Sequence, residues 1–257
     1  MGTATMPNNG DTIAVWFSCG AASAIAAQET LRQYGDRCTV RIINSPVAEE
    51  DRDNRRFLAD VAVWLGVEVE IAFNSNYPGA SAVDVWAKRK AMSFPHGGAP
   101  CTVHLKKEAR QEWEKDNRAD WHVLGFTVEE RDRYARFKLT ERDNVLPVLI
   151  DANLSKAECA QRLVEAGIRL PRVYRQGYPN ANCLGCVKAT SPTYWNHVRR
   201  VHPKVFQARA KQSRELGVRL VRHKGERIFL DELPAHATGA PMKDMQTECG
   251  LFCEETT

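Results

Sequence analysis

The segment TIAVWFSCGAAS, residues 12–23, decides how the rest of the chain is interpreted. Its apolar first half predicts a short buried strand, and its small residues predict a tight turn into a helix that ends at Gly35. At such a turn Ser18, Gly20 and Ser23 can offer hydroxyl and backbone N–H groups to an anion, helped by the helix dipole. An ordinary strand–helix turn has the same composition, so both interpretations stay open.

Strand and helix patterns continue to alternate after this segment. Gly66 ends the second predicted helix. Strict alternation of this kind predicts an α/β fold, a parallel sheet with helices on both faces, and right-handed crossovers place ligands at one edge of it. The later predicted strands are CTVRIIN, VEVEIAF and WHVLGF, and the later helices are EEDRDNRRFLADVAVWLG, SAVDVWAKRKAMSF and TVHLKKEARQEWEKD.

The pattern changes near residue 150. LSKAECAQRLVEAG predicts a helix with Ser155 as its cap and Gly167 as its stop, and SPTYWNHVRRVHPKVFQARAKQSRELG predicts one or two more. We expect four parts: a disordered tail over 1–11, an α/β domain over 12–150, a helical cysteine-bearing part over 151–240 and a mobile tail over 241–257.

The composition is that of an ordinary globular protein. The 257 residues are 43% hydrophobic and 26% charged, with a net charge of +4. No apolar run approaches the roughly 20 residues that span a bilayer, and the N-terminus lacks the pattern of a signal peptide. We therefore expect a cytoplasmic protein with no membrane partner. Two segments are rich in basic residues, HLKKEAR and HVRRVHPKVFQARAKQSRELGVRLVRHKGER. Each could bind phosphate or nucleic acid, or could form a solvent-exposed helix face that only keeps the protein soluble.

Five of the eight cysteines lie in loops where chemistry is plausible. Cys183 and Cys186, in NCLGC, have the spacing at which two thiolates grip a zinc ion or an iron–sulfur cluster. Either centre needs about four ligands. The alternatives to a functional metal centre are a redox dithiol and a purely structural zinc site. Lysines close in sequence would stabilise thiolates. The further candidate ligands are Cys101, Cys249 and Cys253, and the lysines are Lys106 and Lys188.

The segment LGFTVEERDRYARF follows a predicted strand and is rich in arginine. Arg131 and Arg133 suit a phosphate or sulfate, although a solvated helix start looks the same. His104 and His122 lack metal-ligand spacing and are expected to be structural.

Taken together, these motifs resemble the sulfonucleotide reductases of the adenine nucleotide alpha hydrolase superfamily. The similarity is greatest to phosphoadenosine phosphosulfate (PAPS) reductase-like proteins of phages and prophages. FSCGAAS resembles a modified PP-loop, and APCTVHLKK resembles the element with the first cluster cysteine. LGFTVEERDR resembles the sulfate-binding segment, NCLGC resembles the second pair of cluster cysteines, and ECGLFC resembles the catalytic tail.

The chain departs from the family pattern at several positions. Ala22 stands where superfamily members that use ATP carry an aspartate, which argues against ATP pyrophosphatase chemistry. Thr102 replaces the second of two adjacent cysteines, and Cys253 stands in the tail where the family has histidine. Thr127 and Val128 replace arginines, so sulfate recognition depends on Arg131 and Arg133.

The resemblance implies a reductase that releases sulfite from a sulfonucleotide such as PAPS. Cys249 would be the nucleophile and a thioredoxin-like protein the electron donor. Cys101, Cys183, Cys186 and Cys253 would hold a [4Fe-4S] cluster, with zinc as the runner-up. Cys249 and Cys253 could exchange these roles. Residues 12–150 would then bind the adenine nucleotide, 151–240 the cluster, and 241–257 would be catalytic. The nucleotide would be held by Ser18, Gly20, Ser23, Lys106, Arg131 and Arg133.

Two other functions fit the same motifs. One is an iron–sulfur-dependent sulfur transferase that acts on a nucleobase or tRNA. Three matched cysteines and a basic C-terminal half favour this function, and Ala22 argues against it. The other is a non-enzymatic nucleotide-binding module with a structural zinc ion.

Overall fold

The computed structural model describes residues 6–94 and 98–242. The chain forms two compact units, each built from separate segments. The first unit contains residues up to 46, 52–73 and 109–171, and the second contains 47–51, 74–108 and the segment from 172 onward.

A five-stranded parallel sheet forms the centre of the first unit, in the order β3-β2-β1-β4-β5. The central strand β1 pairs Val15 with Ile42 of β2 and with Val123 of β4. Ile13, Ala14 and Val15 are fully buried, as expected for a strand covered on both faces. The strands are β1 Thr12–Trp16, β2 Thr39–Asn44, β3 Val69–Ile71, β4 Trp121–Val123 and β5 Val145–Leu146.

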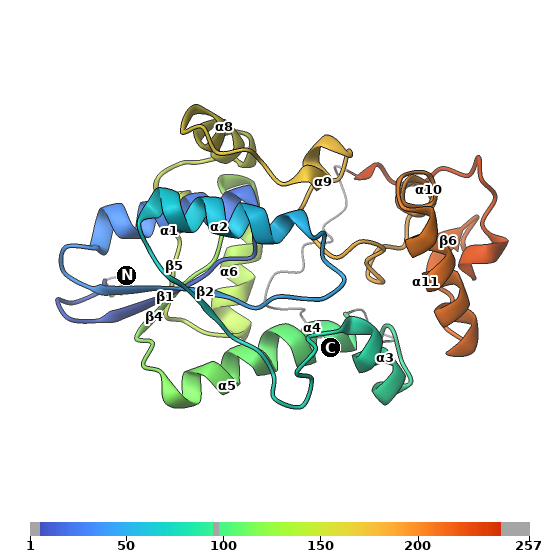
Figure 1. Cartoon of the computed structure of the whole chain (residues 1–257), viewed down its shortest axis with the longest axis horizontal. Coiled ribbons are helices and arrows are strands. Elements are labelled where there is room, and N and C mark those ends of the chain that lie inside the picture. The colour runs from blue at the N-terminus through green and yellow to red at the C-terminus, as the bar shows by residue number, and fades with distance from the viewer. Residues whose placement is uncertain (1–5, 95–97, 243–257) are drawn as a thin grey trace. The chain divides into compact units, whose positions relative to one another are not determined.

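Helices cover both faces of this sheet. Figure 1 shows α1 and α2 on one side of it and α5 on the other. Right-handed crossovers require this, because the chain first moves from β1 to β3 and then crosses back from β3 to β4 in the opposite direction. After β5 the helices α7 and α8 pack against α1. The helices are α1 Ala21–Tyr34, α2 Asp53–Leu65, α5 Glu108–Asp116, α6 Arg131–Thr140, α7 Val148–Asp151 and α8 Lys156–Glu165.

The predicted fold class is confirmed, and several helix ends lie where the sequence placed them. Gly35 caps α1, and Gly66 caps α2 in the left-handed conformation at φ 65°. Ser155 accepts a hydrogen bond from the backbone N–H of Glu158, so the predicted cap of α8 forms. The two-residue strand β5 was not predicted, because it is too short to show any periodicity.

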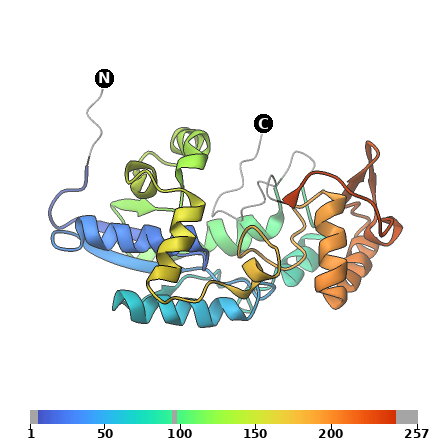
Figure 2. The same cartoon turned by 90° about the horizontal axis from the view of Figure 1, so that it is seen from above.

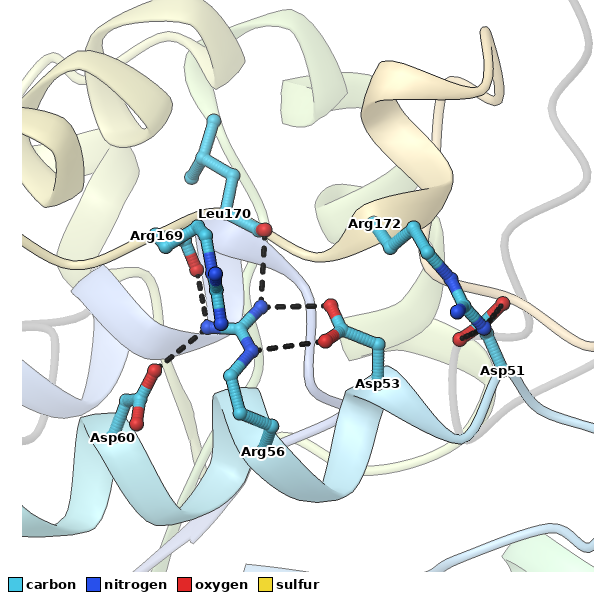
Figure 3. A network of polar contacts seen from close by, with 7 residues as sticks. All are labelled: Asp51, Asp53, Arg56, Asp60, Arg169, Leu170 and Arg172. Atoms are coloured by element: carbon cyan, nitrogen blue, oxygen red, sulfur yellow. Dashed lines mark hydrogen bonds and ion pairs between the residues drawn. The ribbon is translucent and has the colours of Figure 1, made fainter.

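Arg56 ties α2 to the segment that follows α8, as Figure 3 shows. Its guanidinium binds the carboxylates of Asp53 and Asp60, each at 2.7 Å, and donates to the carbonyls of Arg169 and Leu170. These contacts, chiefly the hydrogen bond to Asp53, raise the pKa of Arg56. The network satisfies carbonyl groups of an irregular segment that no strand or helix pairs.

The second unit is mostly helical and has its own core. Figure 2 shows α10 and α11, in orange, packed side by side. Trp195, Leu220 and Leu230 are almost fully buried in this core. Its elements are α3 Ala82–Arg89, α4 Pro100–Thr102 with the π-helical turn Val103–Lys107, α9 Arg172–Arg175, α10 Pro192–Val201, α11 Pro203–Glu215, β6 Val221–His223 and β7 Glu226–Ile228.

The segments that make up the two units differ from the domains 12–150 and 151–240 expected from the sequence. Residues 74–108 pack with the second unit, whereas 151–171 pack with the first. An ion pair between Asp51 and Arg172, at 2.7 Å, joins two separate segments of the second unit (Figure 3). Across residues 6–94 and 98–242, no helix combines the length and the apolar character that crossing a membrane requires.

His122 is a structural residue of the sheet, as predicted. Its ring stacks on Trp16, whose Nε1 donates to His122 Nδ1 at 3.1 Å, and Arg142 contacts its Nε2. Burial, followed by the charges of Arg142 and Arg110, lowers the pKa of His122 to about 3. The folded protein therefore holds this imidazole in its neutral form.

Because only the neutral form fits the fold, His122 should stabilise the protein above its unfolded pKa of about 6.5. This contribution should be lost as the pH falls from about 6.5 toward about 3, at up to about 1.4 kcal/mol per pH unit. We expect urea unfolding between pH 4 and 7 to show a flatter pH dependence for His122→Asn than for the wild type. The exposed His236→Asn is the control and should follow the wild type; parallel curves for His122→Asn would contradict this account.

Candidate functional site

The first unit has a topological switch point between β1 and β4. From β1 the chain runs on toward β3, and from β4 it runs the other way to β5. In open parallel sheets, ligands bind in the crevice at the carboxyl ends of the two strands that flank such a point. Residues 18–20 follow β1 and residues 124–127 follow β4, so both segments start at this edge.

The turn after β1 closes around one hydroxyl group. Ser23 Oγ donates to the Gly20 carbonyl at 2.9 Å and lies 3.2 to 3.3 Å from the backbone nitrogens of Ser18 and Gly20. Ser23 is buried, whereas Ser18 is exposed. Ser23 therefore shapes the turn from inside, and Ser18 is the hydroxyl that a ligand can reach.

Cys19 holds a conformation that is rare for a residue with a side chain. It lies in the left-handed region at φ 59° although it is almost fully buried. Asn44, at the end of β2, donates from Nδ2 to the Phe17 carbonyl at 2.7 Å and to Cys19 Sγ at 3.5 Å. Strain of this kind costs on the order of 1–3 kcal/mol and is often found at functional sites.

Gly125 allows the segment after β4 to approach the start of α1. A Cβ atom at Gly125 would lie 2.8 Å from the backbone nitrogen of Ser23 and 3.0 Å from the carbonyl carbon of Ala22. No side chain fits there, so a glycine is required for the two segments to meet.

The two arginines predicted to bind sulfate differ in their surroundings. Arg133 pairs with Glu130 at 2.7 Å and lies over the ring of Phe126. Arg131 is exposed at the start of α6 and donates to the carbonyl of Ile150 at 3.4 Å. Of the two, Arg131 is the more accessible to an incoming anion.

In the second unit, residues 183–186 form the CLGC turn, which is seated on α11. Gly185 is in the left-handed conformation at φ 66°, and a Cβ there would lie 2.9 Å from Val205 Cγ1 and 3.2 Å from Arg209 Cγ. The N–H of Cys186 donates to the hydroxyl of Tyr194 at 2.7 Å. Gly185 and Tyr194 thus fix the conformation of the turn.

Cys101 packs against the same core as the two cysteines of this turn. Cys186 belongs to that core with 6% of its surface exposed, and the half-buried Cys101 and Cys183 both contact it. The three sulfur-bearing residues thus converge on one hydrophobic cluster from segments far apart in the sequence. Cys101 lies in α4, which continues directly into the π-helical turn Val103–Lys107. Turns of this kind are rare and are often found at functional sites.

Lys106, in that turn, is buried and has an acidic partner. Its Nζ lies 3.1 Å from Glu50 Oε1, and both side chains belong to the second unit. The residues proposed to bind the nucleotide are therefore divided: Lys106 lies in the second unit, and Ser18, Gly20, Ser23, Arg131 and Arg133 lie in the first. His104 pairs with Glu108 and packs on Tyr77, as a structural histidine would.

Arg209 is a buried cation beneath the CLGC turn. Only 5% of it is exposed, and its guanidinium donates to the carbonyl of Gly185 and to Gln212 while it stacks over Trp86. Burial lowers the pKa of Arg209, and Glu49, Cys183, Tyr194 and Cys101 lie close enough to act in the opposite direction.

The carboxylate of Glu49 is already engaged, because it accepts hydrogen bonds from Ser81 and from the N–H groups at the start of α3. No carboxylate among the described residues hydrogen-bonds Arg209. A buried guanidinium needs nearby negative charge. The carboxylate of Glu49 supplies part of it, and thiolates at Cys101 and Cys183 would add to it.

This arrangement suits a metal–thiolate centre. Within the described part of the chain, no three metal-binding side chains are gathered tightly enough to hold an ion as they stand. The donor set is nevertheless appropriate, since thiolates prefer zinc and iron–sulfur clusters and Arg209 would offset their negative charge. Cys249 and Cys253, the predicted nucleophile and fourth ligand, lie outside the described residues.

A small pocket opens beside Cys183. Met242, the last described residue, lines this pocket, so the segment that carries Cys249 begins close to the CLGC turn. The other lining residues are Tyr178, Pro179, Asn180, Asn182 and Tyr194.

Sequence reasoning missed three residues that shape these sites. Arg209 occupies the buried stripe of α11 together with Phe206, Ala210 and Ser213. A charged residue within an apolar stripe at helical spacing was the available signal. Asn44, a polar residue at the end of an apolar strand, gave a weaker signal, and Tyr194 gave none.

Comparisons with known proteins find only distant likenesses. No protein-family model matches the chain, and no curated protein sequence matches it. One similar solved structure is the PAPS reductase of Candida auris in a phosphate complex, with a TM-score of 0.44 and 13% identity, covering 71% of this chain and 84% of that one. Another is the U34-tRNA thiolase NcsA of Methanococcus maripaludis with its [4Fe-4S] cluster, with a TM-score of 0.41 and 11% identity, covering 82% of this chain and 73% of that one. At these values the likenesses assign neither a family nor an activity to the chain.

The close approach at Gly125 can be tested directly. Gly125→Ala places a methyl group against the backbone of Ser23, so the segment 124–127 or the start of α1 has to move. We expect the free energy of unfolding to fall by about 1–3 kcal/mol. Chemical denaturation measures this. In the control Gly79→Ala the new Cβ lies 3.7 Å from its nearest neighbour and should be tolerated; equal stability of the two variants would contradict the prediction.

The role of Arg209 predicts a loss of metal affinity. Arg209→Gln keeps a polar side chain but removes the charge that offsets the thiolates. We expect the affinity for zinc or iron to fall by about 10- to 100-fold, as for other residues that support metal ligands, measured by competition with a chelator. Arg214→Gln changes an exposed arginine of the same helix and should retain wild-type affinity; unchanged affinity in Arg209→Gln would refute the role.

Proposed function

We propose that this chain is a sulfonucleotide reductase-like enzyme that releases sulfite from PAPS or a related adenylylsulfate. The observation that carries the proposal is that Cys101, Cys183 and Cys186 all contact the core of the second unit, with Cys101 and Cys183 close enough to the buried Arg209 to interact with its charge. The turn at the switch point of the sheet supports it, because the exposed hydroxyl of Ser18 and the N-terminus of α1 suit the phosphate of a nucleotide.

The roles of the chain's residues follow from their chemistry. Ser18, Gly20 and Ser23 would hold the nucleotide phosphate, and Arg131, Arg133 and Lys106 would neutralise the sulfate. Arg131 is the best placed of the three, since Lys106 and Arg133 already have acidic partners. A [4Fe-4S] cluster on Cys101, Cys183, Cys186 and Cys253 would have an electrostatic and structural role, without electron transfer.

The proposed reaction has two steps. The thiolate of Cys249 attacks the sulfate sulfur, which forms an S–S bond and breaks the bond from that sulfur to the nucleotide phosphate oxygen. A donor dithiol such as that of a thioredoxin-like protein then attacks Cys249 Sγ and closes to a disulfide, so sulfite leaves and the Cys249 thiol returns. The sulfur is reduced by two electrons and the donor is oxidised by two.

The tail has the reach for this chemistry. Cys249 lies seven residues after Met242, which lines the pocket beside Cys183. An extended chain of that length reaches about 25 Å. Cys249 and Cys253 can therefore return to the CLGC turn, and either can serve as nucleophile while the other binds metal.

An iron–sulfur-dependent sulfur transferase acting on a nucleobase or tRNA is the second candidate. It is favoured by the basic C-terminal half and by the three cysteines that match the cluster elements directly, Cys101, Cys183 and Cys186. A cluster held by three cysteines leaves one iron open for sulfide. Ala22 speaks against it, because activation of a base by ATP needs an acidic partner for magnesium. A structural zinc ion in a non-enzymatic module is the third candidate.

One set of measurements separates these functions. Anaerobically purified wild-type protein and Cys183→Ser are analysed for iron, zinc and acid-labile sulfide, and are assayed for sulfite release from PAPS and adenylylsulfate with reduced thioredoxin. We expect iron and sulfide in roughly equal amounts, sulfite release by the wild type, and loss of both in Cys183→Ser. Cys159→Ser alters a fully buried cysteine away from the second unit and should retain the metal.

Other results would exclude the proposal. Zinc without sulfide would indicate the structural module. Iron and sulfide without sulfite release, together with tRNA-stimulated ATP hydrolysis, would indicate the sulfur transferase.

A further inference from the structure

The hydroxyl of Tyr194 lies against the backbone of the CLGC turn. Tyr194 belongs to the first turn of α10, only 5% of it is exposed, and its oxygen accepts a hydrogen bond from the N–H of Cys186 at 2.7 Å. The rings of Tyr178 and Trp195 pack edge to face with its ring, at centroid distances of 6.1 and 5.3 Å. These contacts hold the phenol in place, so its hydroxyl stays at the turn.

This hydroxyl has a hydrogen-bonding capacity that the described residues leave unused. A phenolic O–H accepts through its oxygen and donates through its hydrogen. The oxygen of Tyr194 accepts from Cys186, but its own hydrogen meets no acceptor within residues 6–94 and 98–242. Buried polar groups in native proteins are normally satisfied, because an unmade hydrogen bond costs stability. The hydroxyl is therefore suited to a group that becomes an acceptor when the site is complete.

The sulfur of Cys186 is the acceptor nearest to hand. It belongs to the same residue as the nitrogen that the Tyr194 oxygen binds, so rotation about the Cα–Cβ bond carries the sulfur around that nitrogen. Tyr194 and Cys183 also line the same small pocket. Burial raises the pKa of Tyr194, and negative charge on Cys186 and Cys183 raises it further. Both sulfur atoms are thus within electrostatic range of the hydroxyl.

The protonation state of the cysteine decides how strong such a hydrogen bond is. A neutral thiol is a weak acceptor. A hydrogen bond to an ionised acceptor is roughly twice as strong as one between neutral groups, and a cysteine that binds metal does so as the thiolate. The hydroxyl of Tyr194 therefore favours the metal-bound form of Cys186 over its free thiol.

We propose that Tyr194 is a positioning residue that donates its hydroxyl hydrogen to the metal-bound thiolate of Cys186. This inference rests on the metal–thiolate centre of the proposed function, but it does not require the reductase reaction. One oxygen then binds both the N–H and the sulfur of Cys186, which fixes the side-chain torsion of this ligand. Hydrogen bonds of this kind orient metal ligands and tune the electronic properties of the metal.

Tyr194 and Arg209 have different effects on the centre. Arg209 brings a full positive charge beneath the turn and acts on Cys101 and Cys183 together. Tyr194 is neutral and acts on one ligand through a directed bond. Its removal should therefore change the spectrum of the metal–sulfur bonds as well as the affinity for metal.

The test uses the full-length protein, stripped of metal with a chelator and loaded anaerobically with Co²⁺, whose sulfur-to-cobalt charge-transfer absorption reports on the thiolates. A hydrogen bond lowers the energy of the sulfur lone pair, so its loss in Tyr194→Phe should move the band to longer wavelength. The affinity for Co²⁺ should fall by about 10- to 100-fold. Tyr134→Phe, which removes a hydroxyl bonded to the Val145 carbonyl in the first unit, is the matched control and should keep the wild-type band and affinity.

Tyr194→3-fluorotyrosine separates donation to sulfur from packing of the turn. The fluorinated phenol keeps the shape of tyrosine but is a stronger donor and a weaker acceptor. We expect its charge-transfer band to move to shorter wavelength, opposite to that of Tyr194→Phe. A band that stays in place in both variants, or that moves in the same direction in both, would overturn the proposal and leave Tyr194 only as the acceptor for the N–H of Cys186.

The same spectra distinguish failure of this inference from failure of the proposed function. Absence of a charge-transfer band in the wild type would remove the metal–thiolate centre and this inference with it. A wild-type band with no response to either change at Tyr194 would overturn the inference and retain the centre. Opposite shifts in a protein that releases no sulfite would support the inference and exclude the reductase.

Discussion

The second unit depends on one physical constraint: the guanidinium of Arg209 is buried beneath the CLGC turn, and no carboxylate within residues 6–94 and 98–242 hydrogen-bonds it. Burying a cation without compensation costs several kcal/mol. The carbonyl of Gly185 and the ring of Trp86 offset part of this cost, and the sulfur groups of Cys101 and Cys183 are near enough to offset more as thiolates. The carboxylate of Glu49 also acts on Arg209, and a metal–thiolate centre is consistent with the electrostatics of this core.

In the first unit, close backbone packing shapes the turn at the edge of the sheet, where we propose that a nucleotide phosphate binds. Gly125 lets the segment after β4 meet the start of α1, and Ser23 closes the turn from inside. The left-handed Cys19 adds strain, which the hydrogen bonds from Asn44 help to hold. Close backbone approach leaves Ser18 as the reachable hydroxyl, in keeping with a nucleotide phosphate as ligand.

Much of the fold could be predicted, because its signals are local. Buried strands appear as apolar runs, and the ends of α1, α2 and α8 are marked by Gly35, Gly66 and Ser155. The strand β5 and the hairpin β6–β7 were missed, since strands of two or three residues show no period. In the candidate sites, the cysteines and serines were recognisable by residue type, while Arg209 and Tyr194 act through neighbours that lie far away in the sequence or on another helix.

The sequence by itself determined the alternation of strands and helices, the parallel sheet, and the cysteine spacing that predicts a metal site. Each of these depends on residues a few positions apart. Only the tertiary structure decided that residues 74–108 pack with the segment after 172, and that Cys101 and the CLGC cysteines contact the same core. The physical reason is that burial and charge compensation are set by neighbours in space, which a linear pattern does not specify.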